Sequence, residues 1–270
     1  MCPHGFGCGP GRSLTISIHP TAIVSPEAKL AGNVSVGAYS VIEGNVIIGA
    51  GTSIGNFATV CSGTTIGQES QIYHNCSIGE APQDLKYQGE KTTVKIGDRV
   101  IIRESVTINR GTAALGKTTI GDDVLLMAYV HIAHDCMVGS HAILANLTTL
   151  GGHVEIGDWA SLGGGVLIHQ FCRIGEHAFI GGGYRIVQDV PPYILAAGEP
   201  LRFGGINRIG LRRRGFSSET RDLIKKVYKE YFLNKASRSE ALTVIKNDLT
   251  NTTEVKKIID FIESSERGII

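Results

Sequence analysis

The sequence predicts a parallel β-helix, an all-β solenoid of short strands, followed by a C-terminal α-helical domain. In this chain of 270 residues an aliphatic side chain recurs at every sixth position from Ile18 to Ile186. The series fails only at Asp84, Glu90 and Ala114, which lie in two loop-like stretches, and it gives way to helical spacing beyond Ile186. A period of six matches neither the 3.6 residues of a helix turn nor the alternation of a simple strand, and it is typical of hexapeptide-repeat β-helices.

The repeat sets the expected domain boundaries. We expect a flexible N-terminal extension over residues 1–13, a β-helix over 14–192 and a helical domain over 193–270. Loops are expected at 79–95 and 110–119, and functional residues concentrate on such excursions. Glycine often follows the aliphatic residue, which we attribute to corners that need unusual backbone angles. These glycines are Gly37, Gly49, Gly55, Gly67, Gly97, Gly121, Gly139, Gly157 and Gly175.

The tail after residue 192 carries helix signals. Ser217 or Ser218 is a candidate N-cap for a helix over "FSSETRDLIKKVYKEYF", and Ser237 with Glu240 forms a candidate capping box for the next. The apolar stripes of the three expected helices are Leu223, Val227, Tyr228 and Tyr231, then Leu242, Ile245 and Leu249, then Val255, Ile258, Ile259 and Ile262.

Composition narrows the class of protein. The chain is 42% hydrophobic and 19% charged, which is typical of a globular core. Residues 191–270 hold 15 Lys and Arg against 10 Asp and Glu, so the tail is basic and suited to an acidic partner or a phosphate. No apolar run has the roughly 18 residues of a membrane span, and the start of the chain lacks the apolar region of a secretory signal.

The six cysteines show no disulfide spacing, which indicates that the protein belongs in the reducing cytoplasm.

The hexads resemble those of the hexapeptide-repeat acyltransferases. The resemblance implies triangular coils of three hexads, 18 residues a turn, wound left-handedly. Ile78 and Ile96 would then be one coil apart, with the first loop leaving the column between them.

With that coil length, residues 18 apart stack at the strand spacing of about 4.8 Å. His134 of "YVHIAHDC" then lies below Gly152 and Gln170, and Asp135 lies beside His153, all at a corner. A zinc site of histidines, as in related β-helix carbonic anhydrases, is one interpretation of this cluster, and solvent-facing histidines are a second. We favour a third, in which His134 is a general base oriented by Asp135, without a covalent intermediate.

A closer resemblance rests on seven motifs that occur in order, "QDLKY", "IRESVTI", "HIAHDC", "GGHV", "HQF", "QDVPPY" and "RRGF". Over residues 14–270 the chain is similar to the UDP-N-acetylglucosamine 3-O-acyltransferases, which begin lipid A synthesis. The resemblance implies that His134 removes the proton of the sugar 3-hydroxyl, that Asp135 orients it, and that the backbone N–H of Gly152 stabilises the oxyanion.

The same resemblance implies the remaining site residues. The sugar-nucleotide site would be formed by His131, His153, His169 and Gln170, by Asp84 and Lys86 from the first loop, and by Asn207, Arg213 and Arg214 at the phosphates. Gly182 would admit a long 3-hydroxyacyl chain. The expected partners are an acyl carrier protein with a 3-hydroxyacyl thioester, UDP-N-acetylglucosamine and two further copies in a cytoplasmic homotrimer.

No cofactor, metal, nucleic acid or integral membrane contact is expected. A sugar with a 3-amino group is an alternative acceptor. Two other classes stay open, a zinc carbonic anhydrase-like enzyme and a non-catalytic trimeric scaffold.

Overall fold

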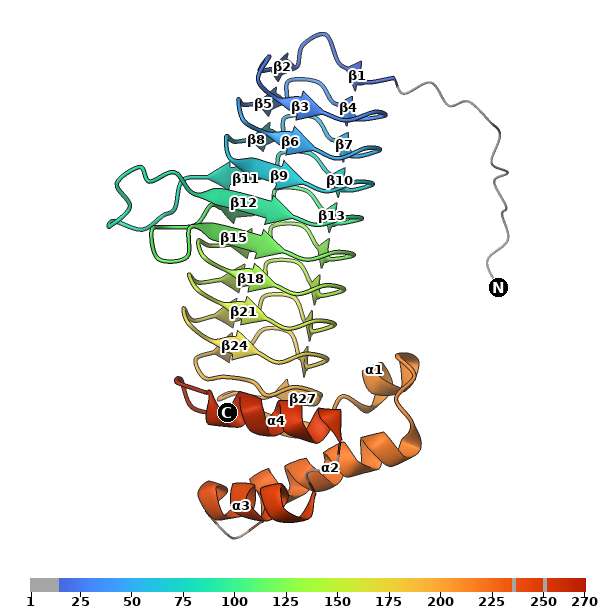
Figure 1. The fold of residues 1–270 in the computed structure, drawn as a ribbon, viewed down its shortest axis with the longest axis vertical. Coiled ribbons are helices and arrows are strands. Elements are labelled where there is room, and N and C mark those ends of the chain that lie inside the picture. The colour runs from blue at the N-terminus through green and yellow to red at the C-terminus, as the bar shows by residue number, and fades with distance from the viewer. Residues whose placement is uncertain (1–14, 235–236, 250–251) are drawn as a thin grey trace, which may run out of the picture.

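A computed structural model describes residues 15–234, 237–249 and 252–270. The extension expected over 1–13 lies outside these residues. The chain winds into a three-sided column with a small helical domain at its C-terminal end (Figure 1). The strands nearest the viewer, such as β12, β15 and β18, run to the right while the chain descends, so the winding is left-handed, as predicted.

Three parallel sheets form the sides of the column, and they are named here in chain order. The first sheet contains β1 (Ser17–Ile18), β4 (Ser35–Val36), β7 (Ser53–Ile54), β10 (Gln71–Ile72), β13 (Ile101–Ile102), β16 (Leu125–Leu126), β19 (Ile143–Leu144), β22 (Ser161–Leu162), β25 (Phe179–Ile180), β27 (Ile194–Ala197) and the antiparallel β28 (Arg202–Ile206). The second sheet contains β2 (Ile23–Val24), β5 (Val41–Ile42), β8 (Thr59–Val60), β11 (Ser77–Glu80), β14 (Thr107–Asn109), β17 (His131–Ile132), β20 (Thr149–Leu150), β23 (Leu167–Ile168) and β26 (Arg185–Ile186). The third sheet contains β3 (Lys29–Leu30), β6 (Ile47–Ile48), β9 (Thr64–Ile66), β12 (Thr93–Ile96), β15 (Lys117–Ile120), β18 (Met137–Val138), β21 (Glu155–Ile156) and β24 (Arg173–Ile174).

The core is built by two inward positions in each hexad. The aliphatic residue of the repeat and the residue two places before it are both buried, as in Val130 and Ile132. Cys76, Cys136 and Cys172 occupy the second of these positions as free, buried thiols. Each fully buried aliphatic side chain contributes roughly 1.5–3 kcal/mol of transfer free energy, so stacking many hexads stabilises the column.

The explanation given above for the repeat glycines is wrong. The left-handed backbone conformation falls two residues after these glycines, at positions such as Tyr39, Asp123 and His141 with φ of 56–59°. A Cβ on Gly49 would instead lie 2.5 Å from the backbone of Gly67 in the next coil. Glycine is needed there because adjacent coils approach closely.

The first loop also differs from the prediction. Ile78 pairs with Val60 and Ile108, whereas Ile96 pairs with Ile66 and Ile120, so Ile78 and Ile96 lie on adjacent sheets and are not one coil apart. The loop preserves the phase because it inserts two hexads into one corner, and this lengthens the spacing of paired residues from 18 to 30.

Four helices follow the column, α1 (Arg208–Arg213), α2 (Ser218–Leu233), α3 (Arg238–Asp248) and α4 (Thr253–Glu263). Ser217 caps α2, and Ser237 with Glu240 forms the predicted capping box of α3. The predicted stripe of α4 is buried. Ion pairing between Lys257 and Glu176, at 2.8 Å, ties α4 to the last coils.

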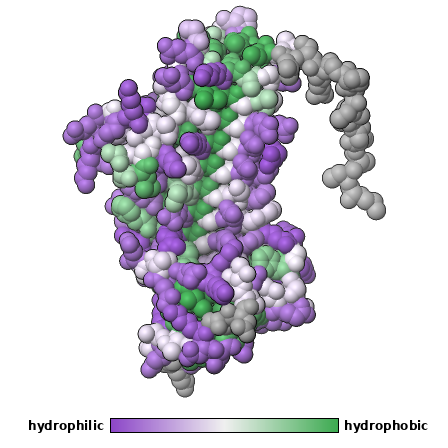
Figure 2. All heavy atoms as spheres, in the orientation of Figure 1, coloured by the Kyte–Doolittle hydropathy of each residue, from purple (hydrophilic) through white to green (hydrophobic). Residues whose placement is uncertain are grey.

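Among the described residues, no helix combines the length and apolar character needed to cross a bilayer. Hydrophobic residues extend along the length of the column on the face shown in Figure 2, flanked by hydrophilic ones.

Candidate active site

Three edges separate the sheets, and the histidine cluster lies on one of them. We call the corner between the first and second sheets the first edge, that between the second and third sheets the second edge, and the remaining corner the third edge. His134 follows β17 and Gly152 follows β20 on the second edge. The pairing of His131 with Thr149 and of Ile132 with Leu150 shows that residues 18 apart are stacked here, which confirms that prediction.

His134 and Asp135 form a hydrogen-bonded pair. Nδ1 of His134 lies 2.9 Å from Oδ2 of Asp135, whose side chain is completely buried. An ionised carboxylate can only accept, so a neutral His134 bonded to it carries its proton on Nδ1. The Nε2 lone pair is then free to accept a proton from a substrate.

Asp135 is held as a carboxylate by its surroundings. Burial acts to raise the pKa of Asp135, but hydrogen bonds from Thr112 and His134 outweigh it and hold the pKa below its ordinary value. The Thr112 backbone N–H lies 3.0 and 3.1 Å from the two carboxyl oxygens, and its hydroxyl lies 2.6 Å from Oδ2. The pair therefore keeps the charge that orients the imidazole.

Gly152 lies directly against the His134 ring. A Cβ at this position would be 2.5 Å from Cε1 and 2.6 Å from Nε2 of His134. The Gly152 N–H has no hydrogen-bond acceptor among the described residues. A backbone donor beside a general base is the arrangement that stabilises a developing oxyanion.

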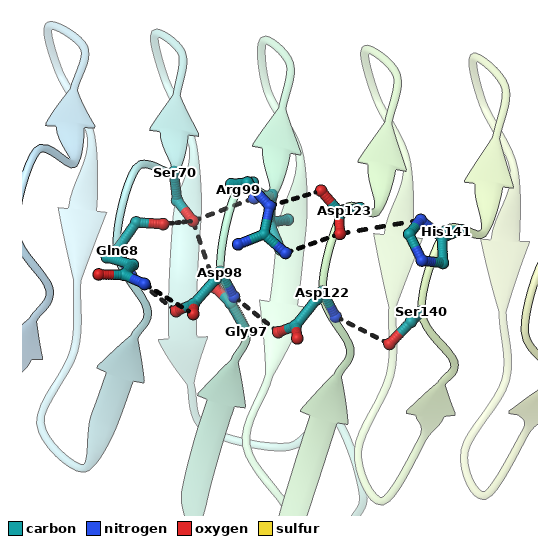
Figure 3. Close-up of polar contacts among 10 residues, drawn as sticks. Gln68, Ser70, Gly97, Asp98, Arg99, Asp122, Asp123, Ser140 and His141 are labelled. Atoms are coloured by element: carbon teal, nitrogen blue, oxygen red, sulfur yellow. Dashed lines mark hydrogen bonds and ion pairs between the residues drawn. The ribbon is translucent and has the colours of Figure 1, made fainter.

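Some other corners use the amide at this position to link neighbouring coils. On the third edge the corresponding N–H of Gln68, Asp98 and Asp122 donates to a side chain of the next coil, at 2.9, 2.8 and 3.1 Å (Figure 3). At 152 the next coil supplies no such acceptor, so this donor remains available to a ligand.

His153 completes the cluster. Its Nε2 lies 3.6 Å from Oδ2 of Asp135, and its ring stacks on Phe171 with centroids 4.5 Å apart. Burial lowers the pKa of His153. The carboxylates of Asp135 and Asp84 act to raise this pKa, but burial outweighs them. A neutral His153 can donate or accept a hydrogen bond towards a substrate.

The second edge also carries most of the other expected residues. His131 lies at the outward position of β17 with Nδ1 2.7 Å from the Thr107 hydroxyl, and burial lowers the pKa of His131. His169 and Gln170 follow β23, and Nδ1 of His169 lies 3.1 Å from an Arg267 nitrogen. A pocket of about 340 Å³ beside the pair is lined by Asp135, His153, Phe171 and residues of the third sheet.

Asp84 and Lys86 lie on the loop between β11 and β12, which leaves this same edge. Asp84 is partly exposed and Lys86 is exposed. The Asp84 carboxylate accepts from the Lys86 backbone N–H at 3.0 Å.

Asn207, Arg213 and Arg214 do not join the cluster within one chain. Asn207 caps α1 and donates to the His177 carbonyl at 2.9 Å, which places it on the third edge. Arg214 lies over the Trp159 ring, 5.2 Å from its centroid, and 3.3 Å from Nδ1 of His177. Arg213 is exposed. In Figure 1, α1 lies below the right side of the column, opposite the loops.

Gly182 lies on the first edge, between β25 and β26. Its Cβ position is 3.0 Å from the carbonyl oxygen of Gly164 in the preceding coil. A Cβ at Gly183 would meet no atom of the described residues within 4 Å. The expected residues thus occupy all three edges of one chain.

Sequence reasoning missed three side chains at the second edge, namely Thr112, Phe171 and Arg267. Phe171 could have been found, because it is 18 residues beyond His153. Thr112 could not, because the second loop shifts the pairing to a spacing of 24. Arg267 arrives from the tail, where no repeat sets the register.

The same cluster has the spacing of a cation site. One ligand atom each from His134, Asp135 and His153 lies within 4.8 Å of the others. The geometry of the three side chains therefore does not by itself separate a general base from a metal site.

Comparison with known proteins identifies the class of protein. A hexapeptide-transferase profile matches residues 27–62 and 117–152, and the profile "Udp N-acetylglucosamine O-acyltransferase; Domain 2" matches residues 189–270. The acyl-[acyl-carrier-protein]–UDP-N-acetylglucosamine O-acyltransferase of Thiobacillus denitrificans is 47% identical over 255 residues, which cover 94% of this chain and 99% of that protein.

Solved structures agree. The UDP-N-acetylglucosamine acyltransferase of Francisella novicida matches with a TM-score of 0.91 and 40% identity over 94% of this chain and 93% of that one. That of Campylobacter jejuni matches with a TM-score of 0.89 and 38% identity over 94% and 98%.

The left-handed column, the hexapeptide-transferase profile and these relatives together define a hexapeptide-repeat acyltransferase. Within that class, the chain belongs to the UDP-N-acetylglucosamine O-acyltransferase family.

Proposed function

We propose that this chain transfers a 3-hydroxyacyl group from acyl carrier protein to the 3-hydroxyl of UDP-N-acetylglucosamine, the first step of lipid A synthesis. The observation that carries the proposal is the His134–Asp135 pair with the unpartnered Gly152 N–H against the imidazole. The names of the relatives supply the substrates.

The chemistry follows from those three groups. Nε2 of His134 takes the proton of the sugar 3-hydroxyl while its oxygen attacks the thioester carbonyl. The tetrahedral oxyanion accepts from the Gly152 N–H. Collapse breaks the C–S bond, and the imidazolium returns its proton to the departing thiolate of the carrier, which leaves an ester and a free thiol. Asp135 holds the tautomer and offsets the imidazolium charge.

The site is proposed to lie between two subunits of a homotrimer. His134 with His131, His153, His169, Gln170, Asp84 and Lys86 belongs to the second edge, whereas Asn207, Arg213 and Arg214 belong to the third and Gly182 to the first. One nucleotide-sugar cannot contact both the second and the third edge of the same column. Packing a second edge against the neighbouring subunit brings these residues together and covers exposed side chains such as Met137 and Leu147.

The basic helical domain is proposed to receive the acidic carrier protein. Arg208, Lys225 and Lys229 line one pocket of about 380 Å³ between β28 and α2. Opposite charge steers such encounters. We place the enzyme in the cytoplasm, because its proposed carrier and nucleotide-sugar substrates and its reduced cysteines are compatible with that compartment. We also propose that Gly182, which has no side chain, leaves room for a long acyl chain.

The test is acyl transfer by purified protein with a 3-hydroxyacyl carrier protein and labelled UDP-N-acetylglucosamine. His134→Ala removes the base and should lower kcat by at least about 10²-fold while the trimer persists. His19→Ala, at an exposed histidine near the start of the column, is the matched control and should leave kcat unchanged. Wild-type turnover by His134→Ala would reject this assignment.

The cation spacing of the cluster favours one other candidate, a zinc hydrolyase. That enzyme would lose activity with a chelator and regain it with zinc. We expect acyl transfer to be insensitive to the chelator, and carbon dioxide hydration to be undetectable with or without added zinc.

A further inference from the structure

The buried carboxylate of Asp135 raises the question of what fixes it. Its side chain is fully buried, and a buried charge is costly unless strong donors meet it. His134 supplies one donor, at 2.9 Å. The others come from Thr112, which lies 23 positions earlier in the chain on the loop between β14 and β15.

The direction of the Thr112 hydroxyl is determined by its neighbours. The Ala114 backbone N–H donates to this oxygen at 3.2 Å, and the Asp135 carboxylate 2.6 Å away can only accept. The hydroxyl proton must therefore point at Oδ2, the same oxygen that accepts from His134. Its hydrogen bond thus sets both the position and the residual charge of the atom that orients the base.

Thr112 is itself held firmly. It is 9% exposed, and its carbonyl accepts from the Gly116 N–H at 2.8 Å, which closes the turn. Gly111 packs so closely on β15 that a Cβ would lie 2.2 Å from the Lys117 nitrogen. Asn109, just before the loop, donates to the Ala81 carbonyl at 2.9 Å and so connects it to the first loop.

From these contacts we propose that Thr112 is a positioning residue for the base, and that the second loop exists at this corner to present its hydroxyl and N–H to Asp135. Thr112 does not touch the reacting atoms; it acts through Asp135 on His134. This inference rests on the proposed function, because it assigns a role in the same proton transfer.

The charged and titratable groups near Asp135 come from its own cluster and from the pocket that it shares with Glu155, Arg173, Asp189 and Glu266. Arg173 of that pocket is paired with Glu155 at 3.4 Å. His134 and His153 approach it at 2.9 and 3.6 Å. The Cys136 thiol follows it in the chain, and burial raises the pKa of Cys136 to about 12, so it stays neutral. The carboxylate of Asp84, on the first loop, acts to raise the pKa of His153. Removing the Thr112 hydroxyl therefore alters the pair without another group that could replace it.

Thr112→Val tests the proposal, because it removes the hydroxyl and keeps the shape and the backbone N–H. We expect kcat to fall by about 10- to 100-fold with little change in KM, as for a small misplacement of a catalytic group. The acid limb of the kcat/KM profile should move to higher pH, because the carboxylate loses a donor that disperses its charge. Thr112→Ser keeps the donor and should restore both.

Thr118→Val is the matched control. Thr118 is a fully buried threonine on the adjacent β15, and its hydroxyl has no partner among the described residues. The same substitution there should leave kcat and the profile at wild-type values.

A second measurement needs no substrate. The rate at which diethyl pyrocarbonate modifies His134, followed by peptide mass spectrometry against pH, should shift in Thr112→Val and not in Thr112→Ser or Thr118→Val. If wild-type protein transfers no acyl group but this shift is seen, the proposed function fails and the positioning role stands. If wild-type protein is active and Thr112→Val matches it in kcat, pH profile and His134 reactivity, the positioning role is overturned.

Discussion

At the scale of single residues, Gly152 shows how the absence of a side chain shapes the site. The base can stand under the next coil only because residue 152 leaves a space where a Cβ would touch both Cε1 and Nε2 of His134. The same residue keeps its N–H unpartnered, whereas the corresponding amides of Gln68 and Asp98 on the third edge are occupied. In the proposed mechanism one glycine therefore serves both the base and the oxyanion.

Gly152→Ala should disable the enzyme without unfolding it. The added methyl would displace the His134 ring, and we expect kcat to fall by about 10²-fold, the size of the effect of a small misplacement of a catalytic group. Steady-state kinetics and a crystal structure of the variant would check the expectation. Near-normal kcat with an undisplaced ring would contradict it.

His177 gives a residue-scale prediction about stability. Burial, assisted by the Arg214 cation, lowers the pKa of His177 to about 4. Between pH 6.5 and 4 the unfolded chain therefore binds a proton that the folded chain does not, so stability should fall as pH falls through this window. Chemical denaturation at both pH values would measure the loss.

His177→Phe keeps the stacking on Tyr193 and should lose much of this pH dependence. His19→Gln, at an exposed histidine, should retain the wild-type slope. An unchanged slope in His177→Phe would show that another group is responsible.

At the scale of elements, the coil is defined by a tight corner and two inward side chains. The six-residue period predicted short strands, and the 18-residue coil implied by the family resemblance predicted their stacking and the place of His134 below Gly152. It was not enough to explain the repeat glycines, since the close approach of Gly49 to Gly67 involves backbone of another coil. Local sequence also could not place Thr112 or Arg267, because loop length and tail docking, and not the repeat, bring them to the second edge.

The corner glycines can be tested by a matched pair. Gly49→Ala would place a methyl 2.5 Å from the backbone of the next coil, and overpacking of this kind costs roughly 1–3 kcal/mol. At Gly44 the nearest atom is the end of the flexible Glu27 side chain, 2.7 Å away, which can move. Thermal unfolding should therefore show a clear loss for Gly49→Ala and little for Gly44→Ala. Equal losses would contradict the close-approach explanation.

At the scale of the whole molecule, the single column separates groups that the proposed reaction needs together. His134 and Arg213 lie on different edges, and the sequence motifs alone gave no indication of this separation. In the proposed homotrimer a second subunit completes this site, which makes subunit mixing a direct test.

Trimers assembled from His134→Ala and Arg213→Ala chains should recover activity that neither variant has. In a mixed trimer one interface joins an intact His134 to an intact Arg213, so random mixing restores about a quarter of the sites. Refolding the two variants together and assaying acyl transfer checks this. A chain that carries both substitutions, mixed with either single variant, is the control and should recover nothing. If the two single variants also recover nothing when they are mixed, both residues belong to one subunit's site.

The two loops have a consequence for how this architecture can change. Each adds a whole number of hexads, which shifts the pairing from 18 to 30 and then to 24 while every aliphatic residue still points inward. Segments whose lengths are multiples of six can therefore enter at a corner without disturbing the coils above and below. A lineage could acquire new substrate contacts in such steps while the inward pattern of the repeat is retained.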